Sequence, residues 1–320
     1  MSSAGETNFG RAPWAVSLHG GHSGEFCDHG TGTLRAIVDA AIARGYRTFG
    51  VAEHAPRYDA RYLYPEEVAM GWDIEKVQRD FEAYARESAE LVKENCRLPI
   101  VDCRLKNENS AASPAFCLLR GFEAEVVPAG DYGRLMNELR VRHGFDYVVG
   151  SVHWVNDLIT DHSKAKFDEA AAKCGGQEAL AVRYYEQVAE MIEAIRPEVV
   201  GHLDVVRKYA APRDAVETPR ARDAARAALS VIQQRGCILD INTAGLRKGL
   251  GSPYPAEWLL RMAAHEFGIG VCFGDDSHSP DEVGAGIIES HRYLIDNGVT
   301  EVTYLTRQGD GVVRVSAPLL

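Results

Sequence analysis

Short apolar segments alternate with longer amphipathic segments along this chain, and the alternation predicts its fold. In residues 31–44, apolar side chains recur at three- and four-residue intervals from Leu34 to Ile42, which is the spacing of a buried helix face. Gly45 follows at the position where a glycine commonly ends a helix. Residues 48–52 then form a short apolar run typical of a buried strand. The pattern predicts a helix followed by a strand.

The same pair of elements recurs to the end of the chain. The pattern predicts helices at residues 31–44, 73–92, 132–143, 177–196, 219–235, 255–267 and 282–297. It predicts strands at residues 14–18, 48–52, 118–124, 146–151, 199–201, 237–242, 270–274 and 302–305. Near-continuous apolar strands separated by helices indicate a parallel sheet covered by helices.

Seven or eight such units without a linker favour one α/β barrel over a doubly wound sheet. No G-x-G-x-x-G motif follows the first predicted strand, which argues against a dinucleotide-binding fold. Residues 93–117 fit the alternation poorly, and we interpret them as an excursion with a short strand at 100–103. We therefore expect a single barrel domain over residues 1–320.

Composition and charge exclude several classes of function. The chain is 46% hydrophobic and 25% charged, which is ordinary for a soluble globular protein. Its net charge of -11 argues against a nucleic-acid partner. No segment approaches the roughly 18 apolar residues of a membrane span, and no signal-peptide core follows the N-terminus. An odd count of 7 cysteines without a CxxC pair favours a reduced, cytoplasmic protein.

The histidines are unevenly placed. In a parallel barrel the active site lies at the carboxyl ends of the strands, and most of the 11 histidines fall there. The strand ends and the first loop carry His19, His22, His29, His54, Glu123, His153, His202, Asn242, Asp276 and His278. Each alone is more often a solvated loop residue, but seven histidines in one topological position indicate a shared site. His143, His265 and His291 lie elsewhere, and His162 stays outside the ligand set.

Imidazoles with carboxylates form a ligand set for zinc, iron or manganese. Seven histidines with Glu123 and Asp276 make nine candidate ligands, which is too many for one ion. The number suits two or three divalent ions. Such clusters catalyse hydrolysis by activating water and polarising the electrophile. Of the cysteines, only Cys27 lies in the loop that carries these residues.

Seven motifs in this sequence resemble the PHP-domain phosphoesterases, and within them the histidinol-phosphate phosphatases of the HisK kind. The motifs are HGGHSGEFCDHG (19–30), AEHAP (52–56), GFEAE (121–125), GSVHW (150–154), GHLDVVRKY (201–209), INTAGLRKG (241–249) and GDDSHS (274–279). The resemblance implies a distorted (β/α)7 barrel with a trinuclear metal site. It also implies hydrolysis of L-histidinol phosphate, a small phosphorylated substrate of histidine biosynthesis.

The resemblance implies three metal positions. The first has the ligands His19, His22, Glu123 and Asp276, the second has Glu123, His153 and His202, and the third has His29, His54 and His278. The family opens with an HxH pair, whereas here Gly20 and Gly21 separate the two histidines. Glycines permit a bulge or tight turn, which we expect to return both imidazoles to one side.

The expected mechanism is attack on phosphorus by a metal-bridging hydroxide, with Asp276, Glu123 and His278 as catalytic residues. Arg207 and Arg247 are the expected phosphate-binding residues because arginine matches phosphate geometry, and Lys208 and Lys248 come next. Asp276 is also a candidate donor of the proton to the leaving oxygen. For the amino group of the substrate, the candidate partners Glu25, Asp28 and Asp161 stay open.

Several alternatives stay open at this point. The chain is also compatible with a PHP phosphoesterase acting on another small monoester or a nucleotide, and with a non-catalytic metal-binding PHP interaction module. An amidohydrolase-like barrel usually carries a metal-bridging lysine at a strand end, and no predicted strand here ends in lysine. A structural zinc protein needs clustered cysteines at short spacing, which are absent from the sequence. The sequence does not determine the oligomeric state.

Overall fold

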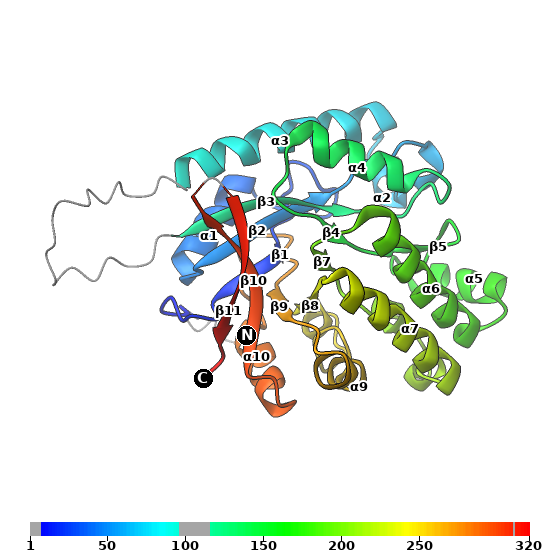
Figure 1. Ribbon diagram of the computed structural model, residues 1–320. Helices are drawn as coiled ribbons and strands as arrows, with labels where there is room; N and C mark the ends of the chain where they lie inside the picture. Colours follow the sequence, from blue (N-terminus) through cyan, green and yellow to red (C-terminus); the bar gives the residue numbers. More distant parts are fainter. Residues whose placement is uncertain (1–7, 96–115, 310) are drawn as a thin grey trace, which may run out of the picture.

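Seven parallel strands form one sheet in the order β1-β2-β3-β4-β7-β8-β9. The computed structural model describes residues 8–95, 116–309 and 311–320. The strands are β1 (Val16–Gly20), β2 (Thr48–His54), β3 (Cys117–Ala124), β4 (Val149–Gly150), β7 (Val199–Val200), β8 (Ile238–Asn242) and β9 (Val271–Gly274). The sheet curls into a nearly closed barrel with helices around its outside (Figure 1). This confirms the predicted α/β barrel.

The two ends of the sheet, β1 and β9, approach each other closely. The backbone N–H of Asp276 donates to the carbonyl of His19 at 2.7 Å. A Cβ atom on Gly274 would lie 2.7 Å from the Cβ of His19, so only glycine permits this approach. The closure brings the first and last candidate ligands of the sequence to neighbouring strand ends.

Most of the longer helices coincide with the predicted apolar pattern. They are α1 (Leu34–Arg44), α2 (Pro65–Ala69), α3 (Ile74–Asn95), α4 (Tyr132–His143), α5 (Lys164–Cys174), α6 (Gln177–Ile195), α7 (Pro219–Arg235), α8 (Ala244–Arg247), α9 (Glu257–Arg261) and α10 (Ile287–Asp296), with 3-10 turns η1 (Ala60–Tyr62), η2 (Val205–Arg207) and η3 (Arg213–Val216) and a π-helical turn η4 (Met262–Glu266). In α1, the Thr33 side chain accepts from the N–H of Ala36, and Gly45 ends the helix at φ 82°. Helix α1 buries Leu34 and Ile37 against the barrel core.

The last predicted strand does not belong to the barrel. Residues 301–308 form β10 (Glu301–Gln308), which pairs antiparallel with β11 (Gly311–Pro318). This hairpin covers the amino ends of the parallel strands: Thr306 contacts Thr48 at the start of β2, and Arg307 donates to Asp146 before β4 at 2.6 Å. Of the seven or eight units counted in the sequence, seven therefore form the barrel, because an apolar run alone does not determine the direction of pairing.

Other elements differ from the predictions at their edges. The predicted helix 255–267 is divided between α9 and the π-helical turn η4, and α10 begins five residues later than predicted, after a series of turns. Helices α2, α5 and α8 and the hairpin of β5 (Trp154–Val155) and β6 (Leu158–Ile159) were not predicted. Most of the predicted excursion at 93–117, including the short strand at 100–103, lies outside the described residues.

Among the described residues, no helix has the length and apolar character needed to cross a membrane. With the β10–β11 hairpin at the amino ends of the strands, the opposite end of the barrel carries the loops that follow each strand. All the candidate ligands belong to this carboxyl end.

Candidate metal centre

Glu123, near the end of β3, lies at the centre of a group of histidines. It is 1% exposed, and its carboxylate lies within 4 Å of five imidazoles. The distances are 3.3 Å to His19 Nε2, 3.9 Å to His22 Nε2, 2.8 Å to His54 Nδ1, 3.5 Å to His153 Nε2 and 3.0 Å to His202 Nε2. The end of β3 therefore brings residues from four other strand ends to one carboxylate.

A bulge in β1 explains how His19 and His22 reach the same side despite their unusual spacing. The register between β1 and β2 shifts between Ser17 and Gly20, and Gly21 has φ +73°. A Cβ atom on Gly20 would lie 2.5 Å from the Phe49 ring, so the bulge requires glycine. As a result, ligand atoms of His19, His22 and Asp276 lie within 4.8 Å of one another. The structure brings both histidines to one side, as the two glycines predicted.

Carboxylates hold the outward nitrogens of four of these histidines. His19 Nδ1 lies 2.7 Å from Asp240 Oδ2, and His22 Nδ1 lies 3.2 Å from Glu53 Oε1. His153 Nδ1 lies 3.0 Å from Glu125 Oε1, and His29 Nδ1 lies 2.9 Å from Asp28 Oδ1. A carboxylate behind a histidine fixes its orientation and directs the other ring nitrogen to a metal ion.

Sequence reasoning missed Glu53, Glu125 and Asp240 as part of the site. The available signal was their position: Glu53 precedes His54, Glu125 lies two residues after Glu123, and Asp240 lies two residues before the strand end at Asn242. Asp240 is 1% exposed and accepts hydrogen bonds from Asn242 Nδ2 and from the backbone N–H of His202. It thereby connects β8 with β1 and β7.

Several inward ring nitrogens have no hydrogen-bond partner among the described residues. The buried Nε2 atoms of His19, His54 and His278 are of this kind. Leaving a buried polar atom unsatisfied costs about 1–3 kcal/mol. In addition, His153 Nε2 and His202 Nε2 face each other at 3.1 Å. Two imidazole nitrogens at that distance need a proton or a cation between or beside them. The residues present therefore fit divalent cations.

Imidazole rings at the mouth of the barrel form a stacked column. The ring of His22 stacks on His54 at a centroid distance of 4.3 Å and on His278 at 4.4 Å. His29 stacks on the other side of His278, also at 4.4 Å. His29 is the most exposed member, with 49% of its side chain accessible. The column continues the ligand group from the barrel interior to the loop after β1.

The pKa values of the histidines are shifted in opposite directions, because nearby carboxylates raise them whereas burial and neighbouring imidazoles lower them. Burial lowers the pKa of His22, but its hydrogen bonds to Asp276 and Glu53 outweigh burial and raise the pKa to about 10. His153 behaves in the same way, because Glu125 and Glu123 raise its pKa to about 10 against the effect of burial. At His54, burial and the charge of His22 lower the pKa. Positive charge is therefore favoured in this cluster, and protons would compete with metal ions for it.

Beside the cluster lies a cavity of about 530 Å³. The ligand side of its wall includes His54, Glu123, Asp276 and His278. The lining also includes aromatic and charged side chains, namely Tyr64, Glu66, Asp161, His162, Lys208 and Tyr209. The ring of His162 stacks on Tyr64, and its Nε2 lies 2.8 Å from Glu66 Oε2. His162 thus lies in the cavity wall but outside the ligand groups, in agreement with its omission from the ligand set.

Arg207, an expected phosphate-binding residue, is buried and paired within the protein. This side chain is 5% exposed, its Nε lies 3.1 Å from Asp204 Oδ2, and its Nη2 donates to the carbonyl of Pro253 at 2.6 Å. Its guanidinium also lies over the ring of Tyr254. Arg207 is not among the residues that line the cavity, whereas its neighbour Lys208 is. This placement argues against direct contact between Arg207 and a phosphate group, because the turn η2 directs it into the protein.

Arg247 lines the cavity but also has structural partners. Its Nη2 donates to the carbonyls of Asp275 and Asp276 at 2.7 Å each, and its Nη1 donates to Thr243. It therefore holds the loop that carries Asp276 while one edge faces the cavity. Lys248 lines the cavity as well.

The three acidic candidates for the substrate amino group are distinguished by their surroundings. Glu25 accepts from the backbone N–H of Leu34 at 2.8 Å and is not part of the cavity wall. Asp28 lines the cavity but holds His29. Asp161 lines the cavity, with Lys208 Nζ at 3.8 Å from its carboxylate. Of the three, Asp161 is the acidic group that faces the cavity without holding a candidate ligand.

The remaining histidines lie away from the site. His265 Nε2 contacts the carbonyl of Asn297, and His291 Nε2 contacts the carbonyl of Leu319, both at 2.8 Å. His143 lies 3.4 Å from Glu82. Their exclusion from the ligand set agrees with these positions.

Comparison with known proteins gives consistent results. The family model described as "PHP domain" matches residues 19–244. The chain is 30% identical over 304 residues to a protein of Schizosaccharomyces pombe named "Probable histidinol-phosphatase", covering 92% of this chain and 91% of that protein. It is 27% identical over 318 residues to a Saccharomyces cerevisiae protein named "Histidinol-phosphatase", covering 90% of each.

Two solved structures share the fold. The hisK structure from Listeria monocytogenes superposes with a TM-score of 0.69 at 24% identity, covering 86% of this chain and 99% of that one. A histidinol phosphate phosphatase from Lactococcus lactis, solved in complex with zinc, L-histidinol and phosphate, gives a TM-score of 0.65 at 18% identity. That match covers 93% of this chain and 98% of the other. At these identities the two structures establish the fold of the barrel.

Proposed function

The chain belongs to the PHP domain family, and we propose that it is a metal-dependent phosphomonoesterase. The proposed reaction is hydrolysis of L-histidinol phosphate to L-histidinol and inorganic phosphate in histidine biosynthesis, in the cytoplasm. The observation that carries the proposal is the grouping of Glu123 with five histidines beside a cavity that also contains lysine and acidic side chains. The names of the relatives and the ligands of the Lactococcus lactis protein support the same substrate.

We assign two or three divalent ions (zinc, iron or manganese) to this cluster. His19, His22 and Asp276 with Glu123 form the first position, and Glu123 with His153 and His202 forms the second. His29, His54 and His278 form the third. When bound, such ions supply Lewis-acid activation of water and neutralise charge on the phosphate.

The phosphate of the substrate is expected at the ligand side of the cavity. Lys208, Lys248 and one edge of Arg247 line that cavity and provide positive charge beyond the cluster. Positively charged groups fixed in place stabilise the charge that develops on the equatorial oxygens during phosphoryl transfer. The net charge of -11 does not oppose binding, because the local field at the cavity governs it.

The carboxylate of Asp276 is suited to bind a metal ion or to accept a proton. Burial raises its carboxyl pKa, but the charge of His19 and the hydrogen bond of His22 outweigh burial and hold the pKa well below its usual range. The carboxylate is therefore ionised, and Asn242 Nδ2 lies 3.2 Å from its Oδ2. Donation of a proton from Asp276 to the leaving oxygen is disfavoured. Glu123 is ionised for the same reason, through the charges of His153 and His19.

The part of the cavity around Asp161 suits the alcohol part of the substrate. We assign the substrate ammonium to Asp161, which lines the cavity from the segment after the β5–β6 hairpin. Tyr64, His162 and Tyr209 provide ring surfaces beside it for the substrate imidazole. This arrangement explains why a positively charged alcohol would be preferred over a neutral or anionic one.

The experiment that tests the function is an assay of phosphate release by the metal-loaded protein. L-histidinol phosphate is compared with a panel of small phosphate monoesters and nucleoside monophosphates, with metal content measured on the same preparation. The highest kcat/KM is expected for L-histidinol phosphate. A higher value for another monoester would transfer the assignment to that substrate, and no hydrolysis of any monoester at full metal content would indicate a non-catalytic metal-binding module.

A further inference from the structure

The loop between β1 and α1 is closed on itself and directs Cys27 inward. The backbone N–H of Cys27 donates to the carbonyl of Ser23 at 2.9 Å, and Gly24 donates to the carbonyl of Gly32. A Cβ atom on Gly30 would lie 2.7 Å from the Ser23 backbone, so the crossing of the loop depends on glycine. Cys27 is 4% exposed as a result.

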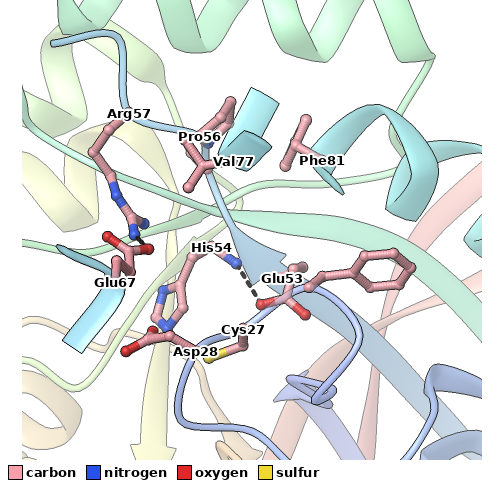
Figure 2. Close-up of a pocket in the computed structure, with 11 residues that line it drawn as sticks. Cys27, Asp28, Glu53, His54, Pro56, Arg57, Glu67, Val77 and Phe81 are labelled. Atoms are coloured by element: carbon pink, nitrogen blue, oxygen red, sulfur yellow. Dashed lines mark hydrogen bonds and ion pairs between the residues drawn. The ribbon is translucent and has the colours of Figure 1, made fainter. Parts of the chain in front are cut away.

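The Cys27 thiol lies among three of the candidate ligands. Ligand atoms of Cys27, His29, His54 and His278 all lie within 4.8 Å of one another. The Sγ atom is 3.4 Å from His29 Nδ1 and 3.7 Å from His29 Nε2. Figure 2 shows Cys27 and His54 meeting where the β1–α1 loop reaches the end of β2. This is the third metal position with one sulfur atom added to its three imidazoles.

The ring nitrogens of this group are oriented to bind a common metal ion. Asp28 holds His29 through Nδ1 at 2.9 Å, and the carbonyl of Asp276 contacts His278 Nδ1 at 3.0 Å. His54 Nδ1 faces Glu123 at 2.8 Å. The Nε2 atoms of His54 and His278 are buried without a hydrogen-bond partner among the described residues. Three imidazoles, two of them with fixed Nδ1 contacts, and a thiol nearby match the ligand number and type of a tetrahedral zinc site.

We propose that Cys27 is the fourth ligand of the metal position formed by His29, His54 and His278. One sulfur and three nitrogens select zinc or cobalt over manganese or magnesium, because thiolate is a soft ligand and the other two ions prefer oxygen. The two positions around Glu123 contain carboxylates and do not share this selectivity. The third position is therefore chemically distinct from the other two.

The alternative is that Cys27 is one of the buried, inert thiols of this protein. Cys237 provides the matched comparison, because it is also 4% exposed but precedes β8 at the amino end of the barrel. Cys272 is buried within β9 as part of the apolar core. Neither belongs to a group of candidate ligands among the described residues. The position of Cys27 is what distinguishes it.

Cobalt loading of the full-length protein tests the proposal. Cobalt bound to thiolate has a charge-transfer absorption in the near ultraviolet, which nitrogen and oxygen ligands do not produce. We expect this band in the cobalt-loaded wild type and in Cys237→Ser, and its complete loss in Cys27→Ser and Cys27→Ala. The visible cobalt bands of the remaining positions should persist in both Cys27 variants, and circular dichroism checks that these variants are folded.

Absence of the charge-transfer band from the fully loaded wild type would overturn the proposal without any variant, and so would its persistence in a folded Cys27→Ser protein. The inference rests on the proposed function only for the presence of metal ions. Phosphate release from L-histidinol phosphate is measured separately. A band with no hydrolysis would contradict the proposed function, whereas hydrolysis with no band would contradict only the role of Cys27.

Discussion

The two ends of the barrel differ in how their polar side chains are arranged. At the amino ends of the strands, the β10–β11 hairpin covers the sheet, and Arg307 Nη2 donates to the carboxylate of Asp146. At the carboxyl ends, imidazoles and carboxylates lie close together, and several buried histidine nitrogens lack a hydrogen-bond partner within the described part of the chain. A substitution at the amino ends of the strands should affect mainly stability, whereas a substitution at the carboxyl ends should affect mainly function. The predictions below test this contrast.

The largest effect is expected at the carboxyl end, for Glu123→Gln. The amide keeps the size of the side chain but removes the negative charge that lies within 4 Å of five imidazoles. We expect loss of detectable phosphate release and a lower metal content, measured by an activity assay and elemental analysis. The protein should remain soluble and folded by circular dichroism. Full activity in this variant would refute the central position of Glu123.

The next largest effect is expected for Asp240→Asn, which changes the carboxylate that contacts the candidate ligand His19. His19 Nδ1 loses its charged partner at 2.7 Å, so the orientation and basicity of the imidazole are less well fixed. Metal affinity is expected to fall about 10–100-fold. Titration with a chelator measures this change. Unchanged affinity would show that Asp240 contributes to packing of β8 and not to the metal centre.

Metal binding should also depend on pH at this end. In the metal-free protein the pKa of His22 and of His153 is raised to about 10, so both hold protons at neutral pH. The stability that these protonated groups contribute is fully present below their unfolded pKa of about 6.5 and is lost as the pH rises towards 10. The metal-free protein should therefore become less heat-stable over this interval.

Bound metal should remove that dependence, because the cation replaces the protons. Metal uptake at neutral pH should release protons, which a weakly buffered solution with an indicator dye detects. Thermal unfolding of the chelator-treated and metal-loaded protein between pH 6.5 and 10 measures the stability. If the two forms lose stability in parallel over this interval, the carboxylates do not hold the histidines charged.

A smaller effect separates two neighbouring residues, Arg207 and Lys208. Lys208→Gln removes a positive charge from the cavity wall and should raise KM about 10-fold with little loss of stability. Arg207→Gln should leave KM unchanged and destabilise the fold by about 3–5 kcal/mol, because Asp204 is left buried without its charged partner. Substrate kinetics and denaturant unfolding on both variants distinguish them. A large rise in KM for Arg207→Gln would instead indicate that Arg207 binds the substrate phosphate.

The strand pattern predicted the barrel, and the structure gathers the candidate ligands at its carboxyl end, because both follow from where buried runs end. The strand pattern did not predict the carboxylates behind the ligands. Whether Asp240 reaches His19 depends on the closure of β1 against β9 and on a bulge, and neither appears in a local pattern. The same limit applies to Arg207: its motif places it after a strand end, but the turn η2 decides which way it points.

The β10–β11 hairpin shows the same limit at the other end of the barrel. An apolar run such as residues 302–305 indicates a strand but does not say which neighbour it pairs with. The glycines of β1 are the opposite case. Their ability to form a bulge is a local property, so the placement of His19 beside His22 was predictable from sequence.

The smallest effect on function is expected at the amino end, for Arg307→Gln. The pair between Arg307 and Asp146 is partly buried, and Asp146 keeps its hydrogen bond from the backbone of Arg120. We expect a loss of about 1 kcal/mol in the free energy of unfolding, with kcat and KM for the substrate unchanged. Denaturant unfolding and steady-state kinetics measure the two quantities. Altered kinetics without altered stability would show that the hairpin is coupled to the metal centre through the strands, and the division between the two ends would then fail.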